Sequence, residues 1–139
     1  MLSEPVMIRF MASKEGVITD TKTNLEWFAG PHENTNWHQA QSWVAELKAA
    51  GGGWRLPTIP ELKSLYIKGM GEYYVDPLFK LNACCVWSEQ QRDSTIAWYF
   101  DFLHGNAFAV DLNRADSGYG LIGFGDPNYE RAFAVRSRR

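Results

Sequence analysis

The chain has 139 residues, of which 45% are hydrophobic and 22% are charged, and its formal net charge at pH 7 is −2. This balance predicts one globular domain over 1–139, with its core at about 16–139 and with residues 1–15 as an N-terminal extension or edge strand. The nearly neutral charge argues against nucleic acid as a partner, and no apolar run is long enough for membrane insertion.

The first half of the chain predicts a β-hairpin followed by a helix. Val17 to Phe28 contains two β-branched or aromatic runs around polar turn residues, and Asn24 tolerates the left-handed turn position. Asn36, with Gln39 three residues later, predicts a helix start, and Gly51 predicts its stop. The apolar residues at helical spacing are Trp37, Ala40, Val44 and Leu47.

Gly51 to Leu62 predicts a helix stop, a short buried crossing and the capped start of a second helix. Thr58 and Glu61 have the spacing of a capping box. Trp54 is expected to fill the core. Arg55 is expected to fix the crossing by pairing with a carboxylate or with carbonyl oxygens, and a ligand role for Arg55 is the alternative.

The second half of the chain predicts antiparallel strands. Residues 72–83 are predicted to form an irregular connection with Val75, Leu78 and Phe79 as anchors. A strand at Cys85–Ser88 and a polar loop at 89–95 follow. The remaining predicted strands are Ala97–Leu103 and Ala107–Leu112, which flank a turn at His104–Asn106, and Ala132–Ser137. Alternation places Trp98, Phe100, Phe102, Phe108, Val110 and Leu112 on one face, and Tyr99 and Asp101 on the other. Two helices followed by an antiparallel sheet indicate an α+β fold.

A long segment without clear secondary structure, residues 113–130, precedes the last strand. Such segments in compact domains are often functional. Aromatic faces with amide and carboxylate oxygens suit a sugar or peptide ligand, and a passive solvated loop is the alternative. The predicted ligand-binding residues are Asp111, Asn113, Asp116, Tyr119, Phe124, Asp126, Asn128 and Tyr129.

The spacing of residues along the chain does not support a dinucleotide, metal or catalytic site. Gly118–Gly123 has the spacing of a dinucleotide fingerprint, but no strand–helix–strand unit can be built around it. The histidines His32, His38 and His104 are scattered without partners at ligand spacing, so no metal is predicted. No catalytic residue is predicted, because spacing alone identifies no nucleophile–base pair and no paired carboxylates.

The cysteines and the first residues bear on the compartment. Cys84 and Cys85 are adjacent, and neighbouring residues rarely bridge, so we expect no disulfide framework. Residues 1–10 contain no apolar run of the kind found in signal peptides. The compartment is left open.

In their order along the chain, these motifs resemble the bacterial DUF1566 family, also called the Legionella collagen-like protein C-terminal domain family. The resemblance runs from about residue 16 to the C-terminus, and Gly53–Leu62 is its most specific block. The other matching blocks are Val17–Trp27, Trp37, Ala40, Val86–Ser88, Ala97–Phe102, Gly105 and Ala134–Ser137.

The resemblance implies a C-type-lectin-like fold, related to the scaffold of formylglycine-generating enzymes and phage variable receptor-binding proteins. That fold has an N-terminal β-hairpin, two helices and a distorted antiparallel sheet with a long loop. The residues expected to be structural on this scaffold are Trp27, Trp54, Arg55, Thr58, Glu61, Trp87 and Trp98.

This chain differs from many members of the family at positions that bear on disulfides, catalysis and metal binding. Many relatives look exported and carry cysteines where this chain has Val44 and Ser137, which agrees with a disulfide-free variant. Formylglycine-generating enzymes use two separated late cysteines, so their activity does not carry over to Cys84 and Cys85. We expect no cofactor. Calcium is the alternative, because Asp126–Asn128 is similar to the Glu-Pro-Asn triplet of sugar-binding lectins.

The combined prediction is a non-catalytic binding module that recognises a glycan or protein through residues 113–130 and adjacent strands. The alternatives are an enzyme related to the formylglycine-generating group and a structural or oligomerisation subunit.

Overall fold

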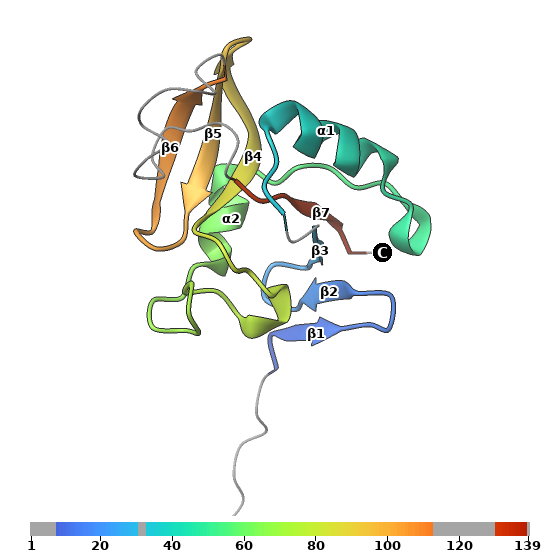
Figure 1. The fold of residues 1–139 in the computed structure, drawn as a ribbon. Helices are drawn as coiled ribbons and strands as arrows, with labels where there is room; N and C mark the ends of the chain where they lie inside the picture. The colour runs from blue at the N-terminus through green and yellow to red at the C-terminus, as the bar shows by residue number, and fades with distance from the viewer. Residues whose placement is uncertain (1–7, 31–32, 113–129, 139) are drawn as a thin grey trace, which may run out of the picture.

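The computed structural model describes residues 8–30, 33–112 and 130–138, which form an α+β fold of two antiparallel sheets and two α-helices. The first sheet has the order β1 (Phe10–Ala12), β2 (Val17–Asp20), β3 (Leu25–Ala29) and β7 (Phe133–Ser137). The second has the order β4 (Cys85–Asp93), β5 (Ile96–Asp101) and β6 (Asn106–Asp111). The helices are α1 (Trp37–Glu46) and α2 (Ile59–Leu65), with 3-10 turns at Ala49–Gly51 and Pro77–Phe79. Figure 1 shows α1 beside the second sheet and the β1–β2 hairpin at the bottom of the molecule.

The predicted N-terminal hairpin is confirmed, and its turn is organised by a buried carboxylate. Asn24 takes a left-handed conformation with φ of 62°. Asp20 accepts two hydrogen bonds of 2.8 Å from the Arg9 guanidinium, and others from Lys22 N and Thr23 Oγ1. Burial by itself raises the pKa of Asp20, but these donors outweigh burial and hold the pKa below its ordinary value.

Both helix starts are capped as predicted. Asn36 and Gln39 form a reciprocal capping box at α1, and Thr58 and Glu61 form one at α2. The predicted stop at Gly51 is wrong for α1, because the helix ends at Glu46 and a 3-10 turn follows.

The crossing segment between the helices holds the last strand in place. The backbones of Arg55 and Val135 exchange two hydrogen bonds, of 3.1 and 2.9 Å. The indole of Trp54 donates to Ala49 O at 2.8 Å. The Arg136 guanidinium lies 4.1 Å from the centre of the Trp54 ring. Trp54 is buried in the core as expected.

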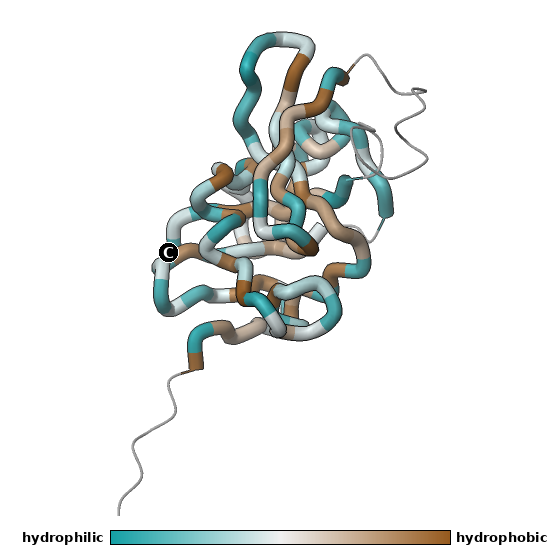
Figure 2. Tube along the Cα trace, turned by 90° about the vertical axis from the view of Figure 1, so that its left-hand side faces the viewer, coloured by the Kyte–Doolittle hydropathy of each residue, from teal (hydrophilic) through white to brown (hydrophobic). Residues whose placement is uncertain are grey.

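The core consists of two clusters that lie on opposite faces of the second sheet. One cluster joins that sheet to α1 through Trp37, Val44, Trp87, Tyr99 and Val110. The other joins it to α2 and the first sheet through Leu62, Leu65, Val86, Phe100 and Val135. Figure 2 shows a hydrophilic run at the top of the molecule, where the chain turns from β4 into β5.

Burial on both faces overturns part of the predicted alternation. Tyr99 pairs with Phe108 and Ala97 with Val110, so Phe108 and Val110 share a face with Tyr99 and not with Trp98. Alternation alone cannot separate an inner from an outer face when helices cover both.

Two further details differ from the sequence prediction. β4 continues to Asp93 through the predicted polar loop, with register shifts where Gln91 pairs with Ala97. Leu78, expected to be an anchor, is 38% exposed, whereas Val75 and Phe79 are buried.

Candidate functional site

Most predicted ligand-binding residues lie outside the part of the chain that the structure describes. These are Asn113, Asp116, Tyr119, Phe124, Asp126, Asn128 and Tyr129. Of the eight predicted residues, only Asp111 is described. It is the last residue of β6, half-buried and paired with Ile96.

Hydrogen bonds fix the chain on both sides of residues 113–129. Leu112 N donates to Thr95 O at 2.8 Å, next to the tip of the second sheet. On the far side, Glu130 is buried, and its carbonyl accepts from Thr35 N at 2.8 Å and from Thr35 Oγ1 at 3.1 Å. Arg131 N then donates to Cys85 O at 2.8 Å, so the chain returns beside the start of β4.

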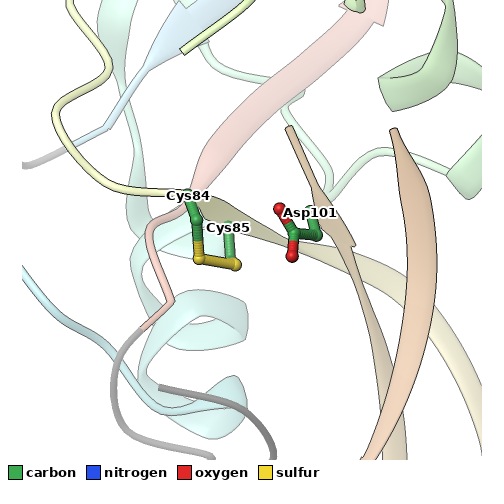
Figure 3. A group of neighbouring side chains, drawn as sticks. All are labelled: Cys84, Cys85 and Asp101. Carbon is green, nitrogen blue, oxygen red and sulfur yellow. A yellow bond between two sulfur atoms is a disulfide. The ribbon is translucent and has the colours of Figure 1, made fainter. Parts of the chain in front are cut away.

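The expectation of no disulfide is wrong, because Cys84 and Cys85 are joined to each other (Figure 3). Neighbouring residues within a regular strand point to opposite faces, but Cys84 lies in the bend just before β4. The two sulfurs can therefore meet. The bond links adjacent residues only, so it does not connect distant segments of the fold.

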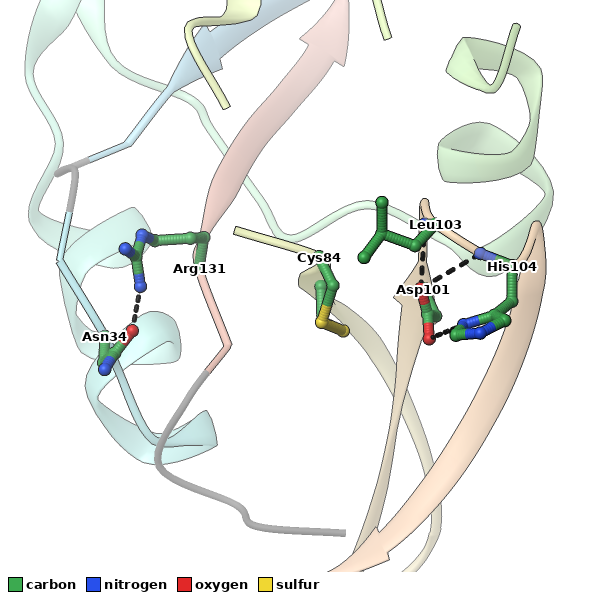
Figure 4. Close-up of a disulfide and its surroundings, with 7 residues drawn as sticks. Asn34, Cys84, Asp101, Leu103, His104 and Arg131 are labelled. Atoms are coloured by element: carbon green, nitrogen blue, oxygen red, sulfur yellow. Dashed lines mark hydrogen bonds and ion pairs between the residues drawn. A yellow bond between two sulfur atoms is a disulfide. The ribbon is translucent and has the colours of Figure 1, made fainter. Parts of the chain in front are cut away.

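A buried carboxylate lies beside this disulfide. Asp101, the last residue of β5, is the register partner of Cys85 and is 1% exposed. Its Oδ1 accepts from Leu103 N at 2.8 Å and from His104 N at 3.2 Å, and its Oδ2 lies 2.7 Å from His104 Nδ1 (Figure 4). The ligand atoms of Cys84, Cys85 and Asp101 all lie within 4.8 Å of one another.

Sequence reasoning missed this group, which we call the sulfur–carboxylate cluster (Cys84, Cys85 and Asp101). The cysteines are far from Asp101 along the chain, and only the register of β4 against β5 brings them together. A usable signal was present in Asp101 and His104, whose spacing across a hairpin turn lets the carboxylate bond the ring.

Arg131 and Asp101 lie on opposite sides of Cys84 (Figure 4). Arg131 Nη1 donates to Asn34 Oδ1, and Arg131 Nη2 donates to Asn82 Oδ1 at 3.2 Å. Its Nε is buried and has no hydrogen-bond partner among the described residues. The position after residues 113–129 is therefore anchored by side-chain contacts as well as by the backbone.

The residues expected to be structural lie mainly in or beside the core. Trp27 and Trp87 are fully buried, and the Trp87 indole donates to Thr35 O at 3.0 Å. Trp98 is half-buried on β5 and is in neither core cluster, so its contribution to the fold stays a prediction.

Arg55 pairs with a carboxylate as expected, and the partner is Glu61. Its two terminal nitrogens donate to the two oxygens of Glu61, each at 2.8 Å. These hydrogen bonds raise the pKa of Arg55. Burial raises the pKa of Glu61, but the bonds from Arg55 and Thr58 outweigh burial and lower that pKa.

Hollows in the described surface include one of about 350 Å³ between the β1–β2 turn and Leu78, and one of about 180 Å³ along residues 71–81. Neither of these two is lined by a cysteine or a histidine. Among the helices described, none is long and apolar enough to cross a membrane.

Comparison with known protein families identifies the family of this chain. A family model described as the Lcl C-terminal domain matches residues 16–120. No curated protein matches the chain in sequence. The matched range contains both helices, the crossing segment, the second sheet and the sulfur–carboxylate cluster.

Proposed function

The chain belongs to the Lcl C-terminal domain family, and on this scaffold we propose a non-catalytic binding module that recognises a glycan through residues 113–130 and the adjacent strands. We also propose that the scaffold is of the C-type-lectin-like type. Its support is the α+β arrangement, in which the N-terminal hairpin pairs through β3 with the last strand β7.

The observation that carries the proposal is the anchoring of residues 113–129 at both ends. Leu112 is bonded to Thr95 on the second sheet, and Glu130 is buried and bonded to Thr35. A long segment between two fixed ends is the usual form of a binding loop on a rigid scaffold. Fixed ends lower the conformational entropy that such a loop loses when it binds.

The residue types of the segment favour a glycan. Tyr119, Phe124 and Tyr129 offer flat apolar faces for a sugar ring, while Asp126 and Asn128 offer oxygens that accept hydrogen bonds from hydroxyl groups. The proposed mechanism is recognition at a surface, in which the second sheet presents residues 113–130 to the glycan and no bond is made or broken.

A glycan array with the purified chain tests this proposal. Truncation of one central aromatic or polar contact weakens binding by about 1.4–2 kcal/mol, which is about ten- to thirtyfold. We expect wild type to bind a defined subset of glycans, and Tyr119→Ala and Asp126→Ala each to weaken that binding by about tenfold or more.

Tyr73→Ala and Glu72→Ala provide a matched aromatic and acidic control in the connection before β4, and we expect both to bind like wild type. Glycan binding that survives both loop substitutions would show that the segment is not the site. A wild-type chain that binds no glycan but captures a purified protein through Tyr119 and Asp126 would replace the glycan with a protein ligand.

A further inference from the structure

We propose that the sulfur–carboxylate cluster is a binding site for a thiophilic divalent cation such as Zn²⁺, and that this site is open only when the Cys84–Cys85 disulfide is reduced. The cluster lies beside Arg131, which follows the proposed glycan-binding segment, but the inference does not depend on glycan binding.

The positions of the three ligand atoms fit one ion. Zn²⁺ lies about 2.3 Å from thiolate sulfur and about 2.0–2.2 Å from carboxylate oxygen, so ligand atoms around a tetrahedral ion are roughly 3.5–4 Å apart. The ligand atoms of Cys84, Cys85 and Asp101 already lie within 4.8 Å of one another. The two sulfurs are bonded to each other in the disulfide, so they must move apart after reduction, and rotation of the cysteine side chains allows this while both stay beside Asp101.

The backbone holds each ligand in place without the disulfide. Cys84 O accepts from Phe102 N at 2.7 Å, and Cys85 O accepts from Arg131 N at 2.8 Å. Cys85 and Asp101 are also register partners in the second sheet. Reduction of the sulfur–sulfur bond therefore leaves the three residues side by side.

The Asp101 carboxylate is held by hydrogen bonds and keeps one acceptor position for a metal. Its Oδ2 is bonded to His104 Nδ1, and its Oδ1 takes the backbone donors Leu103 N and His104 N. A carboxylate has about four lone-pair positions, so one position remains on Oδ2 for a metal. Carboxylates that bind metals are commonly held by hydrogen bonds of their own, and the contact with the His104 ring is such a bond for Asp101.

The charges explain the choice of ion and the dependence on redox state. Two thiolates and Asp101 carry three negative charges in a largely buried place, and a divalent cation offsets two of them. Water can supply the fourth ligand of a tetrahedral zinc ion. In the disulfide both sulfurs are neutral and poor ligands, which leaves only the carboxylate.

Each step balances. Two molecules of a thiol reductant, RSH, reduce the disulfide, which yields two cysteine thiols and one RSSR. Binding of the cation then breaks two S–H bonds, forms two metal–sulfur bonds and releases two protons.

Cobalt titration of the full chain tests the site, because Co²⁺ bound to thiolate gives an intense charge-transfer absorption. The chain is reduced with a phosphine, the phosphine is removed, and Co²⁺ is added with and without competing Zn²⁺. We expect the absorption in the reduced wild type, its loss when Zn²⁺ is added, and no such absorption in the oxidised chain.

Substitutions assign the ligands. Cys84→Ser replaces a half-buried sulfur, and we expect it to lower cobalt affinity about 100-fold, while Asp101→Asn lowers it about tenfold or more. Glu72→Gln, an exposed acid outside the cluster, is expected to bind cobalt like wild type. Circular dichroism verifies that each variant is folded.

Three results would overturn the proposal. They are a reduced wild type that gives no charge-transfer absorption with excess Co²⁺, equal cobalt affinity in the oxidised and reduced chains, and full affinity in folded Cys84→Ser. The comparison of the two redox states uses the wild-type chain alone, so the test stands even if Asp101→Asn fails to fold.

Discussion

Glu61 serves the helix cap and the crossing segment with one carboxylate. Its Oε1 accepts from Thr58 N at 2.9 Å and from Arg55 at 2.8 Å, while its Oε2 accepts a second bond from Arg55. Glutamine can still cap the helix but cannot form an ion pair. We expect Glu61→Gln to lower the free energy of unfolding at pH 7 by about 1 kcal/mol, a modest value because Arg55 is partly exposed and solvent screens the pair.

The same residue gives the stability a pH dependence of known sign. The pKa of Glu61 in the folded chain lies below its ordinary value of 4.5, so the pairing contributes fully above about pH 4.5 and is lost as pH falls through the folded pKa. Urea unfolding should therefore show a wild-type advantage over Glu61→Gln that is smaller at pH 3 than at pH 7. Glu72→Gln, an exposed acid, is the control. An advantage of the same size at pH 3 and pH 7 would contradict the assignment.

At the scale of elements, the β5–β6 hairpin packs against the end of α2 through a glycine. Gly105 has a φ of +72°, and a Cβ atom added there would lie 2.8 Å from the Tyr66 ring. An added methyl group would therefore meet both backbone strain and a ring that is itself packed against Phe100. We expect Gly105→Ala to lower the free energy of unfolding by about 2 kcal/mol or more.

A matched control separates the two effects. Gly69 has a φ of +87° with no atom within 4 Å of an added Cβ, so Gly69→Ala measures backbone strain without the clash. Thermal unfolding of both variants gives the comparison. If the two substitutions cost the same, the contact of the hairpin with Tyr66 contributes nothing beyond the conformation of the turn.

At the scale of the whole molecule, the features that sequence reasoning predicted are those set by neighbouring residues. The hairpin turn at Asn24 and the caps at Asn36 and Thr58 depend on interactions within a few positions, and all three are present. The partner of Arg55 is six positions away, so its pairing with a carboxylate was also predictable.

What could not be predicted depends on register and on distant contacts. Asp101 meets Cys85 only because β4 and β5 pair in one register, and the Arg136 guanidinium reaches the Trp54 ring from the last strand. The length of β4 was missed because its exposed polar end has no apolar alternation to mark it. For residues 113–129, the predicted ligand contacts lie outside the described chain and stay a prediction.

The position of β7 has a consequence for synthesis of the protein on the ribosome. β7 is the last described strand in the chain, yet Val135 pairs with both Trp27 and Arg55 and is fully buried. The two sheets and the crossing segment therefore lack a shared partner until this strand leaves the exit tunnel. We expect stalled nascent chains to resist brief proteolysis only when the tether is long enough to expose Ser137, and resistance at shorter lengths would contradict this. During translation the earlier strands and helices therefore stay incompletely packed until β7 has been made, and their apolar faces are exposed to chaperones in that time.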